Sequence, residues 1–117
     1  MKLRIKGNSL RYRLTRSEVE RFCDSGYFEE IIRFGNTELI YALKKTFADK
    51  LSVSFKDNKI TVFMPTVMAD EWGYTARVGF ESNEGEVYLL VEKDFVCLDT
   101  VNEDQSDNYP NPLLSKE

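Results

Sequence analysis

Histidine is absent from the 117-residue sequence. Because histidine supplies most general bases near neutral pH and is the commonest nitrogen ligand for metals, its absence excludes Ser-His-Asp, Cys-His and histidine-rich zinc sites within this chain. The chain has only two cysteines, Cys23 and Cys97, so a four-thiolate zinc site would need a dimer that contributes both pairs. Three possibilities remain: catalysis by carboxylates, a binding site for a hard cation, or no catalysis at all.

Long apolar runs are also missing. No stretch approaches the roughly 18 apolar residues that a membrane-spanning helix needs, and the start MKLRIKGN lacks the apolar region of a signal peptide. Two distant cysteines in such a chain fit free thiols better than a disulfide framework. We therefore expect a soluble cytoplasmic protein that does not contact the membrane, with a single α+β domain over residues 1–98 followed by an acidic, proline-containing segment over residues 99–117.

Charge is unevenly distributed. Residues 1–21 carry seven Lys or Arg against two Glu, and residues 92–117 carry seven Asp or Glu against two Lys, so the two segments have charges of +5 and −5. We expect the two ends to meet, with Glu92, Asp94 or the acids at 103–107 over the basic face. The cations of that face are Lys2, Arg4, Arg11 and Arg13.

The basic residues belong to a predicted hairpin. Over residues 2–14 basic and apolar side chains alternate, which is typical of half-buried strands, and Gly7-Asn8 is a hairpin turn signal. A turn at this position pairs Arg4 with Arg11 on the outer side, and such like-charge pairs call for acidic groups nearby. The side chains expected on the core side are Leu3, Ile5, Leu10, Tyr12 and Leu14.

Two short helices are predicted. Thr15 and Glu18 form a capping-box pattern at the start of the first helix, and Gly26 stands where a glycine commonly ends one. Cys23 falls on the apolar face of this helix, so we interpret it as a core residue. The second helix covers residues 66–73 and includes Trp72, which we also interpret as a core or interface residue.

Two more tight hairpins, and two strands separated by Gly35-Asn36, complete the fold. Turn signals are Gly35-Asn36, Asp57-Asn58 and Glu84-Gly85, and the last of these would pair Phe80 with Leu89 and Val78 with Val91. The predicted class is α+β: a mainly antiparallel, hairpin-rich sheet of about eight strands with two short helices. The pattern leaves open whether this sheet closes into a barrel.

The acidic segment offers weak candidates for a metal site. Its carboxylates could supply oxygen ligands to Ca²⁺ or Mg²⁺, but their spacing matches no EF-hand loop. The alternative is a partly ordered polar tail. The candidate ligands are Glu92, Asp94, Asp99, Glu103, Asp104 and Asp107.

The stretches MKLRIKGNSLRYRLTRSEV, VEKDFVCLD and DNYPNP resemble a small bacterial family of unknown function. The resemblance implies no activity, but it implies that the C-terminal segment belongs to the domain and is docked on it.

The stretch IKGNSLRYRLTRSEVERF is also similar to the start of swapped-hairpin DNA-binding domains of the MazE and AbrB kind, and LSVSFKDNKITVFMP looks like their closing hairpin. About 25 residues that such domains lack lie between the two stretches, and the acidic excess would oppose contacts with phosphate. The resemblance implies that Lys6, Asn8, Arg11 and Arg13 would face DNA; Arg4 joins them as a candidate for binding another anion.

No catalytic residues stand out, and no cofactor is implied. We therefore expect a small non-enzymatic binding or interaction module, with a protein partner or a second copy of the chain as its partner. One alternative is a DNA-binding regulator that uses the basic hairpin. A second is an Mg²⁺-dependent enzyme that uses the C-terminal carboxylates.

Overall fold

The computed structural model describes residues 1–95 and 106–110. Within these ranges it contains eight strands and two helices, which confirms the predicted α+β class. The elements are β1 (Lys2–Lys6), β2 (Ser9–Leu14), α1 (Arg16–Ser25), β3 (Tyr27–Arg33), β4 (Glu38–Thr46), β5 (Ser52–Lys56), β6 (Lys59–Pro65), α2 (Thr66–Tyr74), β7 (Gly79–Ser82) and β8 (Tyr88–Lys93).

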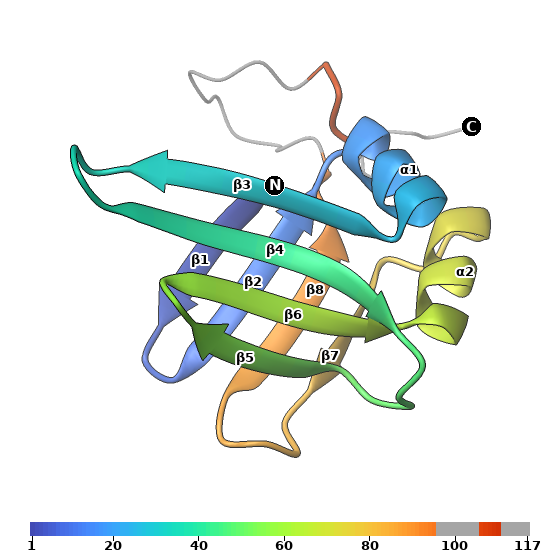
Figure 1. Ribbon diagram of the computed structural model, residues 1–117. Coiled ribbons are helices and arrows are strands. Elements are labelled where there is room, and N and C mark those ends of the chain that lie inside the picture. Colours follow the sequence, from blue (N-terminus) through green and yellow to red (C-terminus); the bar gives the residue numbers. More distant parts are fainter. Residues whose placement is uncertain (96–105, 111–117) are drawn as a thin grey trace.

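The strands form two four-stranded sheets that face each other, with both helices at one end (Figure 1). The strand orders are β1-β2-β8-β7 and β3-β4-β6-β5, and the sheets are not closed into a barrel. Each sheet joins two antiparallel hairpins through one central parallel pair, β2 with β8 and β4 with β6. The sequence pattern predicted the hairpins but not these parallel contacts, which join strands far apart in the chain.

The chain repeats one order of elements twice: hairpin, helix, hairpin. The first half is β1-β2-α1-β3-β4 and the second is β5-β6-α2-β7-β8, and each sheet takes one hairpin from each half. Hydrogen bonds repeat as well. Tyr88 N donates to Asn8 O at 3.1 Å, and Ile40 N donates to Asn58 O at 3.0 Å. The protein is therefore built from two equivalent halves, and each half contributes one hairpin to each sheet.

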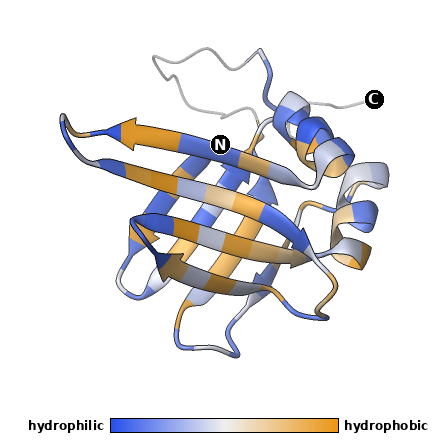
Figure 2. Ribbon diagram, viewed as in Figure 1, coloured by the Kyte–Doolittle hydropathy of each residue, from blue (hydrophilic) through white to orange (hydrophobic). Residues whose placement is uncertain are grey.

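The equivalence is visible in the sequence at an offset of 50 residues. GNSLRYRLTRSEVERF aligns with DNKITVFMPTVMADEW, so Phe22 of α1 corresponds to Trp72 of α2. Both side chains are buried, and their rings pack edge to face with centroids 6.2 Å apart. The two halves thus contribute matching residues to one core between the sheets, where apolar positions alternate with polar ones along the strands (Figure 2).

The first hairpin has the predicted register, with Arg4 opposite Arg11 and Lys2 opposite Arg13. Tyr12 and Leu14 are buried as expected, and Leu3 and Leu10 pack against the core. Ile5 lies on the predicted inner side, where it lines a groove with Leu10, but it is not part of the core because its side chain is 61% exposed. This groove is open and lies between the ends of the two sheets, where residues of the opposing sheet do not enclose Ile5.

The last hairpin differs from its predicted register. Phe80 pairs with Val91 and Ser82 with Leu89, a shift of two residues from the Phe80–Leu89 pairing. A shift by two keeps every side chain on its face, so the apolar pattern could not distinguish the two registers. The connection from Ser82 to Tyr88 is correspondingly longer than the Glu84-Gly85 turn implied.

The helices begin as predicted. At α1, Thr15 N donates to Glu18 Oε1 at 2.9 Å, and Gly26 ends the helix with a φ of 82°. Helix α2 ends at Tyr74, one residue later than expected. Over the part of the chain that is described, neither helix is long and apolar enough to cross a membrane.

Candidate functional site

The predicted basic face lies on the outer side of β1 and β2, beside β8. Glu92 of β8 neutralises two of its arginines, with Oε2 at 2.8 Å from Arg13 Nε and 3.8 Å from Arg11 Nε. Lys2 Nζ lies 3.1 Å from the buried Asp94 carboxylate. Glu92 and Asp94 therefore already offset much of the positive charge that was predicted to bind DNA or another anion.

The other candidates of this face have different surroundings. Asn8 donates through Nδ2 to the Glu86 carbonyl at 2.6 Å, so its amide fastens the hairpin turn to the chain before β8. Arg4 and Lys6 are exposed, and neither forms an ion pair with any residue in 1–95 or 106–110. Of the five predicted residues, these two are the ones best placed to meet an external anion.

The predicted metal ligands are not brought together in the described part of the chain. Glu92 and Asp94 bind the basic face, whereas Asp107 accepts hydrogen bonds from Ser17 Oγ at 2.6 Å and Ser17 N at 3.4 Å. Asp99, Glu103 and Asp104 lie outside the described residues. Within residues 1–95 and 106–110, no group of three carboxylate or thiol side chains could hold a metal ion.

Asp107 instead caps the N-terminus of α1. Its backbone carbonyl accepts a hydrogen bond from Arg16 N at 3.1 Å, and the hydroxyls of Ser17 and Thr15 lower the pKa of its carboxyl group. A carboxylate at this end of a helix pairs with the free N–H groups and with the positive end of the helix dipole. The described part of the C-terminal segment thus caps α1 rather than covering the basic face.

An apolar groove opens at the end of the molecule opposite the helices. It has a volume of about 530 Å³ and lies between the turns of the β1–β2 and β5–β6 hairpins. Two of its side chains, Ile5 and Phe55, are 61% and 69% exposed. The lining residues are Ile5, Gly7, Asn8, Ser9, Leu10, Leu39, Val53, Ser54, Phe55, Ile60 and Val87.

The groove contains equivalent residues from both halves. Ile5 corresponds to Phe55 and Leu10 to Ile60 at the 50-residue offset, and both pairs line its walls. The basic face is not repeated in this way. The positions equivalent to Lys2, Arg4, Arg11 and Arg13 are Ser52, Ser54, Thr61 and Phe63. The two halves therefore share an apolar inner end but not a charged outer face.

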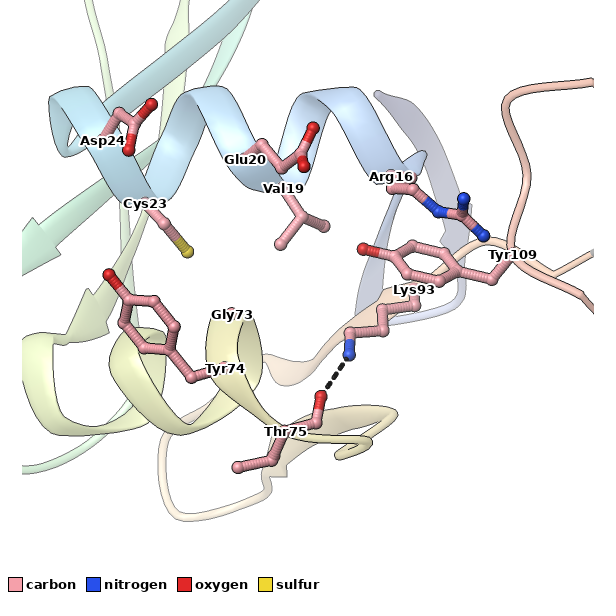
Figure 3. Close-up of a pocket in the computed structure, with 10 residues that line it drawn as sticks. All are labelled: Arg16, Val19, Glu20, Cys23, Asp24, Gly73, Tyr74, Thr75, Lys93 and Tyr109. Carbon is pink, nitrogen blue, oxygen red and sulfur yellow. Dashed lines mark hydrogen bonds between the residues drawn. The ribbon is translucent and has the colours of Figure 1, made fainter.

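A second cleft, of about 590 Å³, lies between α1 and the end of α2 (Figure 3). Lys93 is 7% exposed, and its Nζ donates to the Thr75 carbonyl at 2.9 Å while lying 5.1 Å from the Tyr109 ring centre. Burial lowers the pKa of Lys93, and burial raises the pKa of Tyr109 to about 12. The guanidinium of Arg16 lies over the same ring, at 5.5 Å.

The repeat explains why a lysine is buried in this cleft. Lys45 pairs with Met64 and Lys93 pairs with Leu14 across the parallel strands, so the two lysines occupy equivalent places in the two sheets. Lys45 donates through Nζ to the Cys23 carbonyl at 2.6 Å, near the end of α1. Each lysine therefore binds a carbonyl at the end of one helix, where a cation is favourable. Cys23 itself donates to Ala69 O at 3.5 Å, and burial raises its thiol pKa. It was predicted as a core residue, and in the structure it is half-buried, lining this cleft while packing against the core.

Sequence reasoning missed three features. The 50-residue repeat could have been found by aligning the sequence with itself. Without knowledge of the repeat the groove could not be found, because the alternation of apolar and polar residues makes Ile5 and Phe55 each look like a buried strand residue. The third feature is the α-ammonium group of Met1, which is fully buried between the carboxylates of Glu18 and Glu30, each at 2.6 Å.

Comparison with known proteins places the chain in a family. The family of unknown function DUF7009 matches residues 1–113, and the chain belongs to it. This confirms the resemblance to a small family without an assigned function. No curated protein and no solved structure matches the chain.

Proposed function

We propose that this DUF7009 protein is a non-enzymatic cytoplasmic binding module that holds apolar side chains of a protein partner in the groove between the β1–β2 and β5–β6 hairpins. The observation that carries the proposal is the position of Ile5 and Phe55. They are equivalent residues of the two halves, and both are apolar and mostly exposed.

Exposure of two large apolar side chains beside an apolar groove favours a binding surface. Isolated exposed apolar residues are common, but contiguous ones with a hollow between them mark interaction sites. Covering this area would contribute roughly 25 cal/mol for each Å² of apolar surface removed from water. A partner that inserts one apolar side chain between the hairpins would cover Ile5 and Phe55 together.

The shape of the groove favours a protein over a small molecule. Small-ligand pockets usually enclose most of the ligand surface and present a few polar groups that orient it. This groove is open, and its two most prominent side chains project at its mouth. A larger surface would cover them, in the manner of an interface whose apolar centre lies within a polar rim.

The alternatives have less support. A regulator that reads DNA through both halves would need cations on both outer faces, but Arg11 and Arg13 are replaced by Thr61 and Phe63 in the second half. Glu92 also neutralises the first pair. For an Mg²⁺-dependent enzyme, the three candidate carboxylates that the structure describes are separated: Glu92 binds Arg11 and Arg13, Asp94 binds Lys2, and Asp107 binds Ser17.

The groove can be tested with Nile red, a neutral apolar dye that has no electrostatic attraction to the basic face. We expect its fluorescence to rise on binding, and Ile5→Ser or Phe55→Ser to weaken binding roughly five-fold, as for about 1 kcal/mol at an interface. Phe47→Ser is the matched control, because Phe47 is fully exposed outside the groove. Equal effects of Phe47→Ser and Phe55→Ser would contradict the proposal.

The kind of partner can be tested by photo-crosslinking in cells. A benzophenone side chain placed at position 55 should give a crosslinked species of defined mass, and Ile5→Ser should reduce its yield. The same group at position 47 should not give this species. Crosslinking that is equal at both positions would argue against a protein partner at the groove.

A further inference from the structure

Strand β3 forms one edge of its sheet, and its charged residues, Glu29, Glu30 and Arg33, are of both signs and so do not prevent it from pairing with a reversed copy of itself. It has seven residues, and its only partner strand among the described residues is β4. Ile31 and Ile32 on the strand and Phe34 just after it are 37%, 41% and 63% exposed. Long apolar edge strands readily accept a further strand, and most proteins protect them with charge, proline or short length.

The other edges carry such protection. Strand β1 places Lys2, Arg4 and Lys6 along one face, so two copies of it would repel each other. Strand β7, the equivalent of β3 in the second half, has only four residues. Strand β5 has five residues and ends in Lys56. Of the four edges, β3 is the one that combines length with apolar side chains.

The free hydrogen-bonding groups of β3 follow from its pairing with β4. Phe34 N donates to Thr37 O at 2.7 Å at one end of this hairpin. At the other end, Lys45 N donates to Gly26 O at 2.9 Å. Because bonded and non-bonded pairs alternate along an antiparallel ladder, the odd-numbered residues of β3 turn their N–H and C=O groups away from β4.

These outward groups match a second copy of the same strand. An antiparallel pair centred on Ile31 sets Ile31 opposite Ile31 and Glu29 opposite Arg33 of the second copy, and all of these residues have outward backbone groups. Glu29, Ile31 and Arg33 also share one face of the strand. The pair would therefore contain two Glu29–Arg33 ion pairs that flank an apolar centre, and Phe28 would lie opposite Phe34.

We propose that the protein forms a two-fold dimer through β3, in which the two β3-β4-β6-β5 sheets join into one continuous sheet. The occupant of this edge is a second copy, because the order Glu29, Ile31, Arg33 is complementary to itself when reversed. This interface is separate from the groove, so each proposal can fail without the other.

The dimer is tested by sedimentation over a range of protein concentrations. The average mass of the wild-type chain should rise from 13.6 kDa toward twice that value as concentration increases. Ile31→Pro should remain monomeric, because proline removes an N–H that the second copy needs but that β4 does not use. A wild-type chain that stays monomeric at every concentration, or an Ile31→Pro variant that associates like wild type, would overturn the proposal.

Charge reversal keeps the test independent of folding. Glu29→Arg alone places two arginines opposite each other across the interface, and Arg33→Glu alone places two glutamates there, so each variant should fail to associate with itself. A mixture of the two single variants sets an arginine opposite a glutamate at both ends of the pair, and it should form a heterodimer more readily than either variant dimerises. Failure of the mixture to associate, while both variants are folded by circular dichroism, would overturn the proposed register.

Discussion

Ile5 and Phe55 stand at the same position of two equivalent hairpins, and each leaves more than half of its side chain exposed at the mouth of one groove. The remaining equivalent apolar residues of these hairpins are largely enclosed, including Tyr12 with Val62 and Leu14 with Met64. The exposure of Ile5 and Phe55 is therefore confined to one end of the two hairpins, and the equivalent residues nearer the helices are buried.

The contact between the helices depends on Gly73. A Cβ atom at this position would lie 2.6 Å from Cys23 Sγ, closer than such atoms normally approach. We expect Gly73→Ala to lower the free energy of unfolding by about 1–3 kcal/mol in urea denaturation. Gly85→Ala is the control, since no atom lies within 4 Å of its added Cβ.

Removing the sulfur should relieve the clash at Gly73. In the double variant Cys23→Ala with Gly73→Ala, the loss of stability should be smaller than the sum of the two single losses. Strict additivity would show that the cost of Gly73→Ala does not arise from contact with Cys23.

Lys93 should make stability depend on pH in the alkaline range. Its pKa is lowered from 10.5 by burial, so the unfolded chain binds this proton more strongly than the folded chain. The penalty for burying the charged lysine is therefore relieved, and stability rises, as pH increases from its lowered pKa to about 10.5. Thermal melting of Lys93→Met should lack this rise, whereas Lys45→Met, at the equivalent position, should retain it.

Asp107 should contribute to stability only when ionised. Its pKa is lowered by the hydroxyls of Ser17 and Thr15, so its contribution is present above the ordinary value of 3.8 and is lost as pH falls through the lowered pKa. We expect Asp107→Asn to reduce the melting temperature near neutral pH and to have little effect in strong acid. An equal reduction at both pH values would show that ionisation of Asp107 does not matter.

Glu92 should limit the binding of polyanions to the basic face. Glu92→Gln leaves Arg11 and Arg13 without their carboxylate, so we expect stronger retention on heparin and weak, salt-sensitive binding to mixed DNA. The control is Glu84→Gln, which removes the exposed partner of Lys50. If Glu92→Gln behaves like Glu84→Gln, intramolecular neutralisation is not what restrains this face.

A DNA-binding role would need the two arginines themselves. If wild-type protein shifts DNA, the Arg11→Ala, Arg13→Ala double variant should lose most of that shift. An unchanged shift would show that neither residue contacts DNA and would leave Arg4 and Lys6 as the exposed cations of this face.

Local sequence signals predicted most of the elements because each has a local cause. Gly7-Asn8 and Asp57-Asn58 set the turns of the two hairpins that bound the groove, and alternation set their faces. The parallel pairs β2–β8 and β4–β6 could not be predicted in this way, since they depend on how the two halves exchange hairpins. The register of Phe80 was wrong because a shift of two preserves the alternation.

The candidate site was less predictable than the fold. The basic residues were found because charge is visible in a sequence, but the partners of Arg13 and Asp107 depend on which strand and helix end lie beside them. Ile5 was assigned to the core because its alternation is that of a buried strand. Its exposure depends on how the two sheets pack against each other, and the alternation of residues along one strand does not contain that information.

The groove is tested most directly by mapping a neutral apolar probe, hexanol, on the backbone amide spectrum of the protein. The account predicts that the largest shifts fall on residues 5–10, 53–55 and Val87, with much smaller shifts around Lys93 and on the basic face, and that Phe55→Ser reduces them. Shifts that concentrate in the cleft between α1 and α2, or that are unchanged in Phe55→Ser, would contradict the claim that this groove is the binding site.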